Sequence, residues 1–299
     1  MNQQQSICSQ AREKTRAKRA ATQVFSFFTL RAAAFVNCAA LVIACVFLFV
    51  NGIGALDIEF VLDSPREMMP SGGVFPCLVG TFLLAAGAIA IALPFGVACA
   101  VWLNEYGKQG PVVDIVRLSV ANLAGVPSIV FGLFGLAFFV TALGFNVSLL
   151  SGILTLAVLT LPVIINTTEE ALKQVPRSWR DASLALGATK SQTIGRIVLP
   201  SALPGILTGA ILAVARAAGE TSAVMFTAAV FYTPKLPESV WSSVMALPYH
   251  MYVLATAGTE IEKTRPMQYG TGLLLVVLVF AMNLIAILIR DKMQKKRLA

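Results

Sequence analysis

The sequence predicts an all-α integral membrane protein with six transmembrane helices. Of its 299 residues, 57% are hydrophobic and only 13% are charged, whereas soluble domains average about 45–50% apolar and about 25% charged residues. The mean hydropathy of +0.78 also excludes an intrinsically disordered chain, which needs low hydrophobicity and dense charge. Six apolar runs are long enough to cross roughly 30 Å of hydrocarbon, where a helix satisfies its own backbone groups. A soluble enzyme is therefore excluded.

The apolar runs give the positions of the six helices along the chain. We expect spans at residues 32–50, 76–103, 118–142, 149–166, 203–228 and 272–289. The first run is longer than the apolar region of a signal peptide, so we expect a membrane span there. Three prolines fall inside spans and predict kinks, namely Pro94, Pro127 and Pro162. Small residues recur every four positions on the fifth span and predict close helix packing; they are Ser201, Gly205, Gly209, Ala213, Ala217 and Thr221.

The basic residues predict how the chain is oriented in the membrane. With the N-terminus in the cytoplasm, 18 of the 23 Lys and Arg residues lie on the cytoplasmic side and 4 lie outside. We therefore expect basic cytoplasmic tails at residues 1–31 and 290–299, and a six-span domain at residues 32–289. Because these bases form no stripe beside exposed aromatic residues, we expect lipid and not nucleic acid as their partner.

The residues that usually carry metal or covalent chemistry are sparse. The five cysteines lack close metal-ligand spacing, and the single histidine, His250, has no second ligand or nucleophile beside it. We expect His250 to lie outside the membrane, near Tyr249 and Tyr252. The sequence shows no set of residues for intramembrane catalysis, so we expect neither a metal site nor a cofactor on this chain.

The stretch at residues 167–200, between the fourth and fifth spans, predicts short helices. One would cover residues 169–174, and a second would start after Pro176 and stop at Gly187, because glycine often ends helices. A third would cover residues 189–197 and end at Leu199 and Pro200, before the fifth span. Such a stretch could lie on the lipid headgroups, but we favour an ordered surface for a soluble partner.

A motif within this stretch resembles the coupling motif of ABC-importer permeases, Glu-Ala-Ala-x3-Gly-x9-Ile-x-Leu-Pro. The matching residues are Asp181-Ala182-Ser183, Gly187 and Ile197-Val198-Leu199-Pro200, with Asp181 and Ser183 as conservative departures. The resemblance implies a type I ABC-importer permease fold whose coupling helices seat in an ATPase subunit. Because the chain has no Walker A sequence, ATP and Mg²⁺ would bind that partner, and this chain would not be an enzyme. The expected coupling residues are Glu170, Ala171, Trp179, Asp181, Ala182, Ser183, Gly187, Ile197, Leu199 and Pro200.

The fifth span carries the most costly residues for a membrane interior. Arg216 lies near its centre and Glu220 follows one helical turn later, about 6 Å along the axis. A central Arg costs roughly 2.5–3.5 kcal/mol to insert, so it normally faces a bundle interior or a water-filled cavity. Two interpretations remain open. The pair could be a salt bridge that joins helices, or Arg216 could donate paired hydrogen bonds to a phosphate-like oxyanion.

The run at residues 215–228 contains Arg216 and Gly219-Glu220-Thr221, and it resembles the corresponding span of bacterial high-affinity phosphate-uptake permeases. Residues 124–135 and 243–256 fit the same family, nearer to its A subunit than to its C subunit. The resemblance implies a phosphate pathway at Arg216, Glu220 and Thr221 in the bacterial inner membrane.

The same resemblance implies a set of partners. They would be a homologous second permease subunit, two copies of an ATPase subunit and an extracytoplasmic phosphate-binding protein. Two alternatives stay open from the residues alone. The chain could be a permease for another oxyanion, such as sulfate or molybdate, or it could be a membrane scaffold that signals phosphate status.

Overall fold

The computed structural model describes residues 2–66, 71–108, 110–257 and 261–298. The chain divides into two compact units, Met1–Asn51 and Gly52–Ala299, and each is described by itself. The first unit is formed by α1 (Asn2–Gly52), a helix that continues through residue 31 without interruption. The basic residues of the expected tail and the first expected span therefore share one helix.

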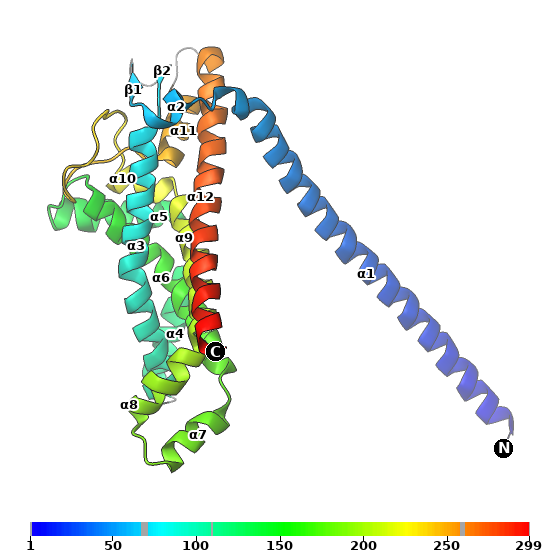
Figure 1. Ribbon diagram of the computed structural model, residues 1–299. Helices are drawn as coiled ribbons and strands as arrows, with labels where there is room; N and C mark the ends of the chain where they lie inside the picture. Colours follow the sequence, from blue (N-terminus) through cyan, green and yellow to red (C-terminus); the bar gives the residue numbers. More distant parts are fainter. Residues whose placement is uncertain (1, 67–70, 109, 258–260, 299) are drawn as a thin grey trace. The chain divides into compact units, whose positions relative to one another are not determined.

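The second unit is built around four long helices that run side by side (Figure 1). They are α3 (Phe75–Val101), α6 (Leu149–Gln174), α9 (Leu199–Ala218) and α12 (Ile261–Leu298). A π-helical turn, η2 (Trp102–Tyr106), continues α3 without a break. Pro94 and Pro162 both lie inside continuous helices, α3 and α6.

Small residues allow α9 to lie close to α6, as the four-residue repeat predicts. A Cβ atom added at Gly205 would lie 2.5 Å from the Cβ of Ala171. One added at Gly209 would overlap the side chain of Thr167. Ala213 is also fully buried. The repeat is therefore a packing surface, because only small side chains leave room for the neighbouring backbone.

The third expected span is not one helix. The structure has α4 (Pro111–Ala124) and then α5 (Ser128–Gly135), which the π-helical segment η3 (Leu136–Ala142) continues. The two parts are bent by 104°. The span expected at residues 118–142 is therefore two helical parts, and the kink predicted at Pro127 is a sharp break between them. Pro127 explains the break, because proline donates no backbone hydrogen bond and keeps the preceding residue out of the helical conformation.

The fifth expected span is also interrupted, which corrects the expectation of one helix at residues 203–228. Helix α9 ends at Ala218, and the short helix α10 (Ser222–Thr227) follows. Gly219 ends α9. The side chain of Glu220 then accepts hydrogen bonds from the first backbone N–H groups of α10, which favours a new helix start over continuation.

The coupling stretch differs from its expected division in two places. Residues 169–174 form no separate helix but the last turns of α6, because Thr168, Glu169, Ala171 and Leu172 keep a buried face there. The chain is also helical from Lys190 to Ala218 without a stop at Leu199 and Pro200, through α8 (Lys190–Thr193) and the π-helical turn η4 (Ile194–Val198). Pro200 lies directly after the π-helical turn η4, where the helix geometry changes from π to α.

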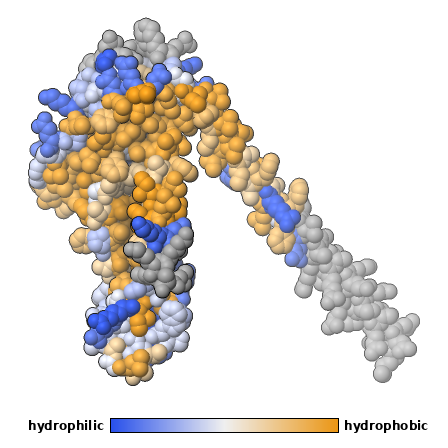
Figure 2. All heavy atoms as spheres, in the orientation of Figure 1, coloured by the Kyte–Doolittle hydropathy of each residue, from blue (hydrophilic) through white to orange (hydrophobic). Residues whose placement is uncertain are grey.

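Six membrane spans are confirmed if the bent pair counts as one. Five helices of the described residues are long and apolar enough to cross a membrane, and the pair α4 and α5–η3 is the sixth candidate. The five are Ser26–Ala55, Phe75–Tyr106, Leu149–Gln174, Lys190–Ala218 and Thr264–Met293. On the visible face of the second unit, apolar residues form a belt with polar residues at both ends (Figure 2).

The two ends of the second unit carry different short elements (Figure 1). The coupling end, as we call it, carries α7 (Arg177–Ala185), α8 and η4. The opposite or far end carries η1 (Ile53–Ala55), α2 (Ile58–Leu62), β1 (Pro65–Arg66), β2 (Ser71–Gly72) and α11 (Leu247–Thr256). The two strands pair antiparallel, with Pro65 opposite Gly72 and Arg66 opposite Ser71.

Candidate functional site

Arg216, Glu220 and Thr221 lie at the interruption between α9 and α10. Arg216 occupies the last turn of α9, and its side chain is exposed. It makes no hydrogen bond or ion pair with any residue that the structure describes. Glu220 lies beyond the helix end, so the two side chains are not neighbours on one helical face. The salt bridge between Arg216 and Glu220, one of the two interpretations left open by the sequence, is therefore not formed in this conformation.

Glu220 instead interacts with the backbone of the next helix. Its Oε1 atom accepts hydrogen bonds from the N–H groups of Ser222 (3.2 Å) and Ala223 (3.4 Å). Thr221 is the residue at the N-terminal boundary of α10, and its carbonyl accepts from Met225 N–H at 2.9 Å. A carboxylate at a helix N-terminus is favourable because it faces unpaired N–H groups and the positive end of the helix dipole. Glu220 is thus engaged by the backbone of α10 and not by Arg216.

The break after α9 packs against the break within the third span. A Cβ atom added at Gly132 of α5 would lie 2.8 Å from the carbonyl oxygen of Ser222 and 3.0 Å from Cα of Ala223. Val126, between α4 and α5, packs against the buried cluster that contains Ala223 and Val224. The helices α5 and α10, each of which follows a break in its span, therefore pack against each other. Interrupted helices of this kind expose backbone groups and form substrate sites in many transporters.

At the coupling end, local capping rather than core burial shapes α7 and α8. Gly187 has a φ of +83° and ends α7 as expected. The N–H of Gly187 donates to Leu184 O (3.0 Å) and the N–H of Ala188 donates to Ser183 O (3.2 Å), which is a Schellman motif. Thr189 and Gln192 then form a capping box that starts α8. This short turn fixes the angle between the two helices.

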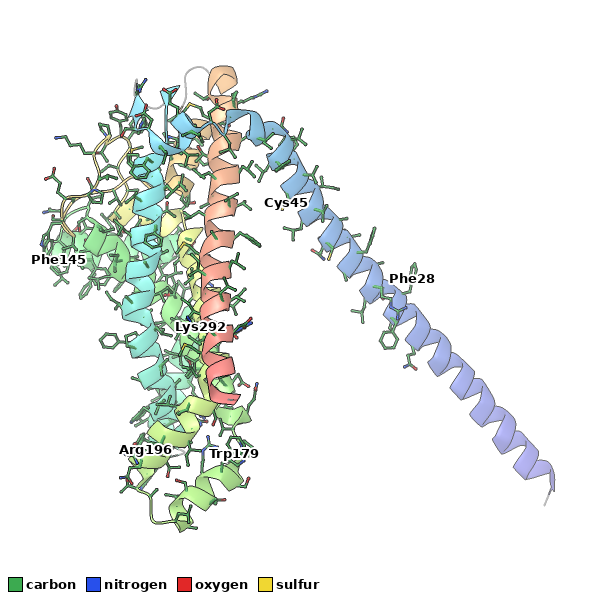
Figure 3. The ribbon with its side chains drawn as sticks, in the orientation of Figure 1. Phe28, Cys45, Phe145, Trp179, Arg196 and Lys292 are labelled. Atoms are coloured by element: carbon green, nitrogen blue, oxygen red, sulfur yellow. The ribbon has the colours of Figure 1, made fainter. Side chains whose placement is uncertain are left out.

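The coupling residues separate into an outward and an inward set. Asp181, Ala182 and Trp179 are exposed, and Leu186 is 90% exposed. Figure 3 shows the side chains of Trp179 and Arg196 at this end of the unit. Ser183 faces inward, where its hydroxyl lies 2.9 Å from that of Thr193. The outward set presents a largely apolar surface.

The remaining expected coupling residues lie at the helix junctions. Glu170 is exposed and pairs with Lys173 at 3.1 Å, whereas Ala171 is buried against Gly205. Ile197, Leu199 and Pro200 are half-buried where η4 joins α9. Apart from Glu170, these residues face inward and attach the coupling stretch to the bundle.

The sequence reasoning missed two ion pairs near the coupling end, of which only the first is largely buried on both sides. Arg180 of α7 binds Glu105 of η2, with Nη2 2.7 Å from Oε1, and their side chains are only 17% and 8% exposed. Arg117 of α4 binds Glu169 of α6 at 2.9 Å. The second pair lies in a cavity of about 330 Å³ that Lys173 also lines. Three of these four residues lie within one turn of a predicted span end, but Arg180 does not. The pairing itself needs the fold.

His250 lies in α11, which is not one of the candidate membrane spans, and its side chain is fully buried. Its Nδ1 atom lies 3.4 Å from the Thr271 hydroxyl, while Nε2 has no hydrogen-bond partner among the described residues. Burial lowers the pKa of His250 from 6.5 to about 4, because desolvation disfavours the charged ring. The residue is therefore neutral at physiological pH, and its side chain packs against α12.

A family model and several curated proteins match most of the chain. The model described as "Binding-protein-dependent transport system inner membrane component" matches residues 92–298. A probable ABC transporter permease protein, YqgI of Bacillus subtilis (strain 168), is 33% identical over 83% of this chain and 90% of its own. The phosphate transport system permease protein PstA 1 of Mycobacterium tuberculosis (strain CDC 1551 / Oshkosh) is 39% identical over 78% of this chain and 77% of its own.

Solved structures of ABC transporters have the same fold. A chain of the MetNI methionine ABC transporter, in an inward-facing conformation, matches with a TM-score of 0.55 and 23% identity. The match covers 74% of this chain and 94% of that one. A chain of the bacterial alginate ABC transporter, in complex with an alginate-bound periplasmic protein, matches with a TM-score of 0.60 and 13% identity. That match covers 90% of this chain and 94% of the other.

Proposed function

The chain belongs to the family of binding-protein-dependent transport system inner membrane components, and we propose that it is one of two non-identical permease subunits of an ATP-driven phosphate importer. It is a multi-pass transmembrane permease component of an ABC importer, as the family match and the curated relatives agree. Phosphate as the substrate is supported by the names of several relatives and by the chemistry of Arg216.

The observation that carries the proposal is the position of Arg216. It is an arginine in a membrane span, at the C-terminal end of an interrupted helix, without an ion pair to any described residue. A guanidinium group stays charged and donates paired hydrogen bonds, which suits the oxygens of phosphate. The negative end of the α9 dipole would partly offset its charge while the pathway is empty. The site should hold phosphate weakly, because conduction requires release.

The proposed assembly includes three kinds of partner. A homologous second permease would complete the pathway, two ATPase copies would bind ATP and Mg²⁺, and an extracytoplasmic phosphate-binding protein would deliver the substrate. The exposed side chains of Trp179, Leu184 and Leu186 support α7 as the surface that docks on an ATPase.

The proposed orientation places both termini and the coupling end in the cytoplasm. It rests on the 18 of 23 basic residues that this orientation assigns to the cytoplasmic side. The far end, with β1, β2 and α11, would then face the binding protein. The protein would reside in the bacterial inner membrane.

The experiment is uptake by the complete complex in sealed vesicles, with binding protein outside and ATP on the side of the ATPase. Labelled phosphate, sulfate and molybdate are compared at equal concentration. We expect ATP-dependent uptake of phosphate above both other anions. Uptake of sulfate or molybdate in place of phosphate would reassign the substrate, and uptake of no oxyanion would reject the pathway at Arg216.

A further inference from the structure

We propose that α3 acts as a relay across the membrane, with Glu105 and Thr81 as positioning residues at its two ends. We call α7, α8 and η4 together the coupling segment. In this proposal, its movement reaches the far end through α3 as well as along the continuous helix from α8 to α9. The inference rests on the proposed function as an ATP-driven importer. It is carried by contacts that fix α3 to the coupling segment at one end and to residues 244–247 at the other.

Both coupling helices contact the same turn at the end of α3. Arg180 of α7 donates two hydrogen bonds to Glu105, from Nη2 at 2.7 Å and from Nε at 3.2 Å, both to Oε1. Lys190 of α8 lies over the ring of Tyr106, with Nζ 5.0 Å from the ring centroid. Glu105 and Tyr106 are consecutive residues of η2, so α7 and α8 attach to one point. Movement of either coupling helix therefore acts directly on α3.

The geometry of the Arg180 contact makes it a rigid connection. Its Nη1 atom also donates to Val175 O at 2.7 Å, and Nη2 donates to Leu172 O at 3.0 Å. One guanidinium group thus joins α7, the end of α6 and the end of α3. Because the pair is largely shielded from water, it is held more strongly than an exposed surface pair. The coupling segment is therefore anchored to two spans in addition to α9.

At the far end, α3 contacts the first residue of α11 and the residues just before it. The N–H of Leu247 donates to the hydroxyl of Thr81 at 2.8 Å, and both residues are buried. The backbone of Met245 lies so close to Gly80 that a Cβ atom there would overlap its carbonyl oxygen. The backbone of Met245 thus packs directly on the backbone of α3, with no flexible side chain between them. A shift of α3 must therefore move residues 244–247 or break the contact.

The helix between these two ends has the length that a relay needs. Thr81 and Glu105 are 24 residues apart on one continuous helix, which at 1.5 Å per residue is about 36 Å. That distance exceeds the roughly 30 Å of a hydrocarbon core. The two attachments therefore lie near opposite membrane surfaces, and α3 connects them without an interruption like those in the third and fifth spans.

The first test measures how far the phosphate-loaded binding protein stimulates ATP hydrolysis by the reconstituted complex. The variants are Glu105→Gln at the coupling end and Thr81→Val at the far end. Asp114→Asn is the control for loss of a carboxylate, because Asp114 is exposed on the neighbouring α4. Thr160→Val is the control for a buried threonine, because the Thr160 hydroxyl bonds only within its own helix.

We expect each α3 variant to lose stimulation at least fivefold while the ATPase still co-purifies, and both controls to stay within twofold of wild type. The double variant should be no worse than the more severe single one, because both changes interrupt one connection. Stimulation within twofold of wild type in both single variants would overturn the proposal. Losses that multiply in the double variant would also overturn it, since they indicate independent sites.

A second measurement remains valid if Glu105→Gln assembles poorly or if the transported anion is not phosphate. A single cysteine replaces the exposed Glu238 in a cysteine-free background, and an impermeant thiol reagent labels it with and without a non-hydrolysable ATP analogue. The variant Lys190→Met, with Lys108→Met as the control, weakens the contact to Tyr106 without removing a buried charge. We expect the nucleotide-dependent change in labelling rate to shrink at least twofold only in Lys190→Met. An unchanged nucleotide effect would contradict the relay, whereas failure of phosphate uptake by wild type would reject only the proposed substrate.

Discussion

Glu220 accepts a hydrogen bond from the backbone N–H of Ser222, with Oε1 3.2 Å from the nitrogen, and so caps α10 instead of pairing with Arg216. This contact divides the roles of the two charged residues in the fifth span. The carboxylate stabilises the second half of the interrupted helix, and in the proposed pathway the guanidinium group binds the anion.

Replacement of Glu220 separates its capping role from a charge-pairing role. Glu220→Ala removes the cap and should destabilise the protein by about 0.5–2 kcal/mol, with reduced uptake. Glu220→Gln keeps an oxygen acceptor and should be close to wild type in both respects. Thermal unfolding in detergent and phosphate uptake measure the two effects, with the exposed Glu238→Ala as the control. If Gln were as harmful as Ala, the negative charge and not the cap would be required.

The contact between the two half-helices predicts a steric effect at Gly132. Gly132→Ala places a Cβ atom 2.8 Å from Ser222 O, and backbone atoms cannot rotate away. We expect a loss of about 1–3 kcal/mol in the free energy of unfolding, and lower uptake. Gly195→Ala is the matched control, because a Cβ there meets no atom within 4 Å. Equal stability of the two variants would mean that α5 and α10 do not pack as described.

The turn between α7 and α8 predicts a strain effect without a steric one. A Cβ at Gly187 meets no atom within 4 Å, but its φ of +83° is unfavourable for residues with side chains. Gly187→Ala should therefore strain this turn by about 1–2 kcal/mol. We expect weaker co-purification of the ATPase with unchanged membrane insertion. Gly187→Asn, which tolerates positive φ better, should retain more ATPase; the reverse order would argue against a role for this turn geometry.

Burial of His250 predicts that stability depends on pH. The unfolded histidine binds a proton below its ordinary pKa of 6.5, whereas the folded one binds it only near 4. Stability should therefore be constant above pH 6.5 and fall as the pH decreases toward 4, by up to about 1.4 kcal/mol per pH unit. Unfolding temperatures between pH 8 and pH 5 measure this dependence. His250→Gln should flatten it, and an equally steep dependence in that variant would assign the effect to other groups.

The sequence predicted the number of spans, the stop at Gly187 and the small-residue contact of α9, because each follows from local composition or spacing. It did not predict the break after Ala218. The run of apolar residues continues through Phe226, and only the capping by Glu220 and the contact with Gly132 reveal a second helix. Hydropathy does not distinguish a continuous span from an interrupted one, since both bury the same residues.

The candidate site was predicted in its residues but not in its geometry. Arg216 stands out as the one base within an expected span, but helical spacing left open whether it pairs with Glu220. The break after Ala218 places Glu220 on the backbone of α10 instead. The pair of Glu105 and Arg180 is 75 positions apart in sequence. No local pattern links these two residues, so only the fold brings them together.

The account rests most directly on Arg216 as the cation of the phosphate pathway. The decisive measurement is ATP-driven uptake of labelled phosphate by the complete complex carrying Arg216→Gln or Arg216→Lys, with the exposed Lys235→Gln as the control. Because a charge-assisted hydrogen bond contributes about 1.5–3 kcal/mol, we predict that Arg216→Gln loses uptake on the order of tenfold or more. Arg216→Lys should be intermediate, and co-purification of the ATPase should be unchanged. Normal uptake by an assembled Arg216→Gln complex would contradict the account.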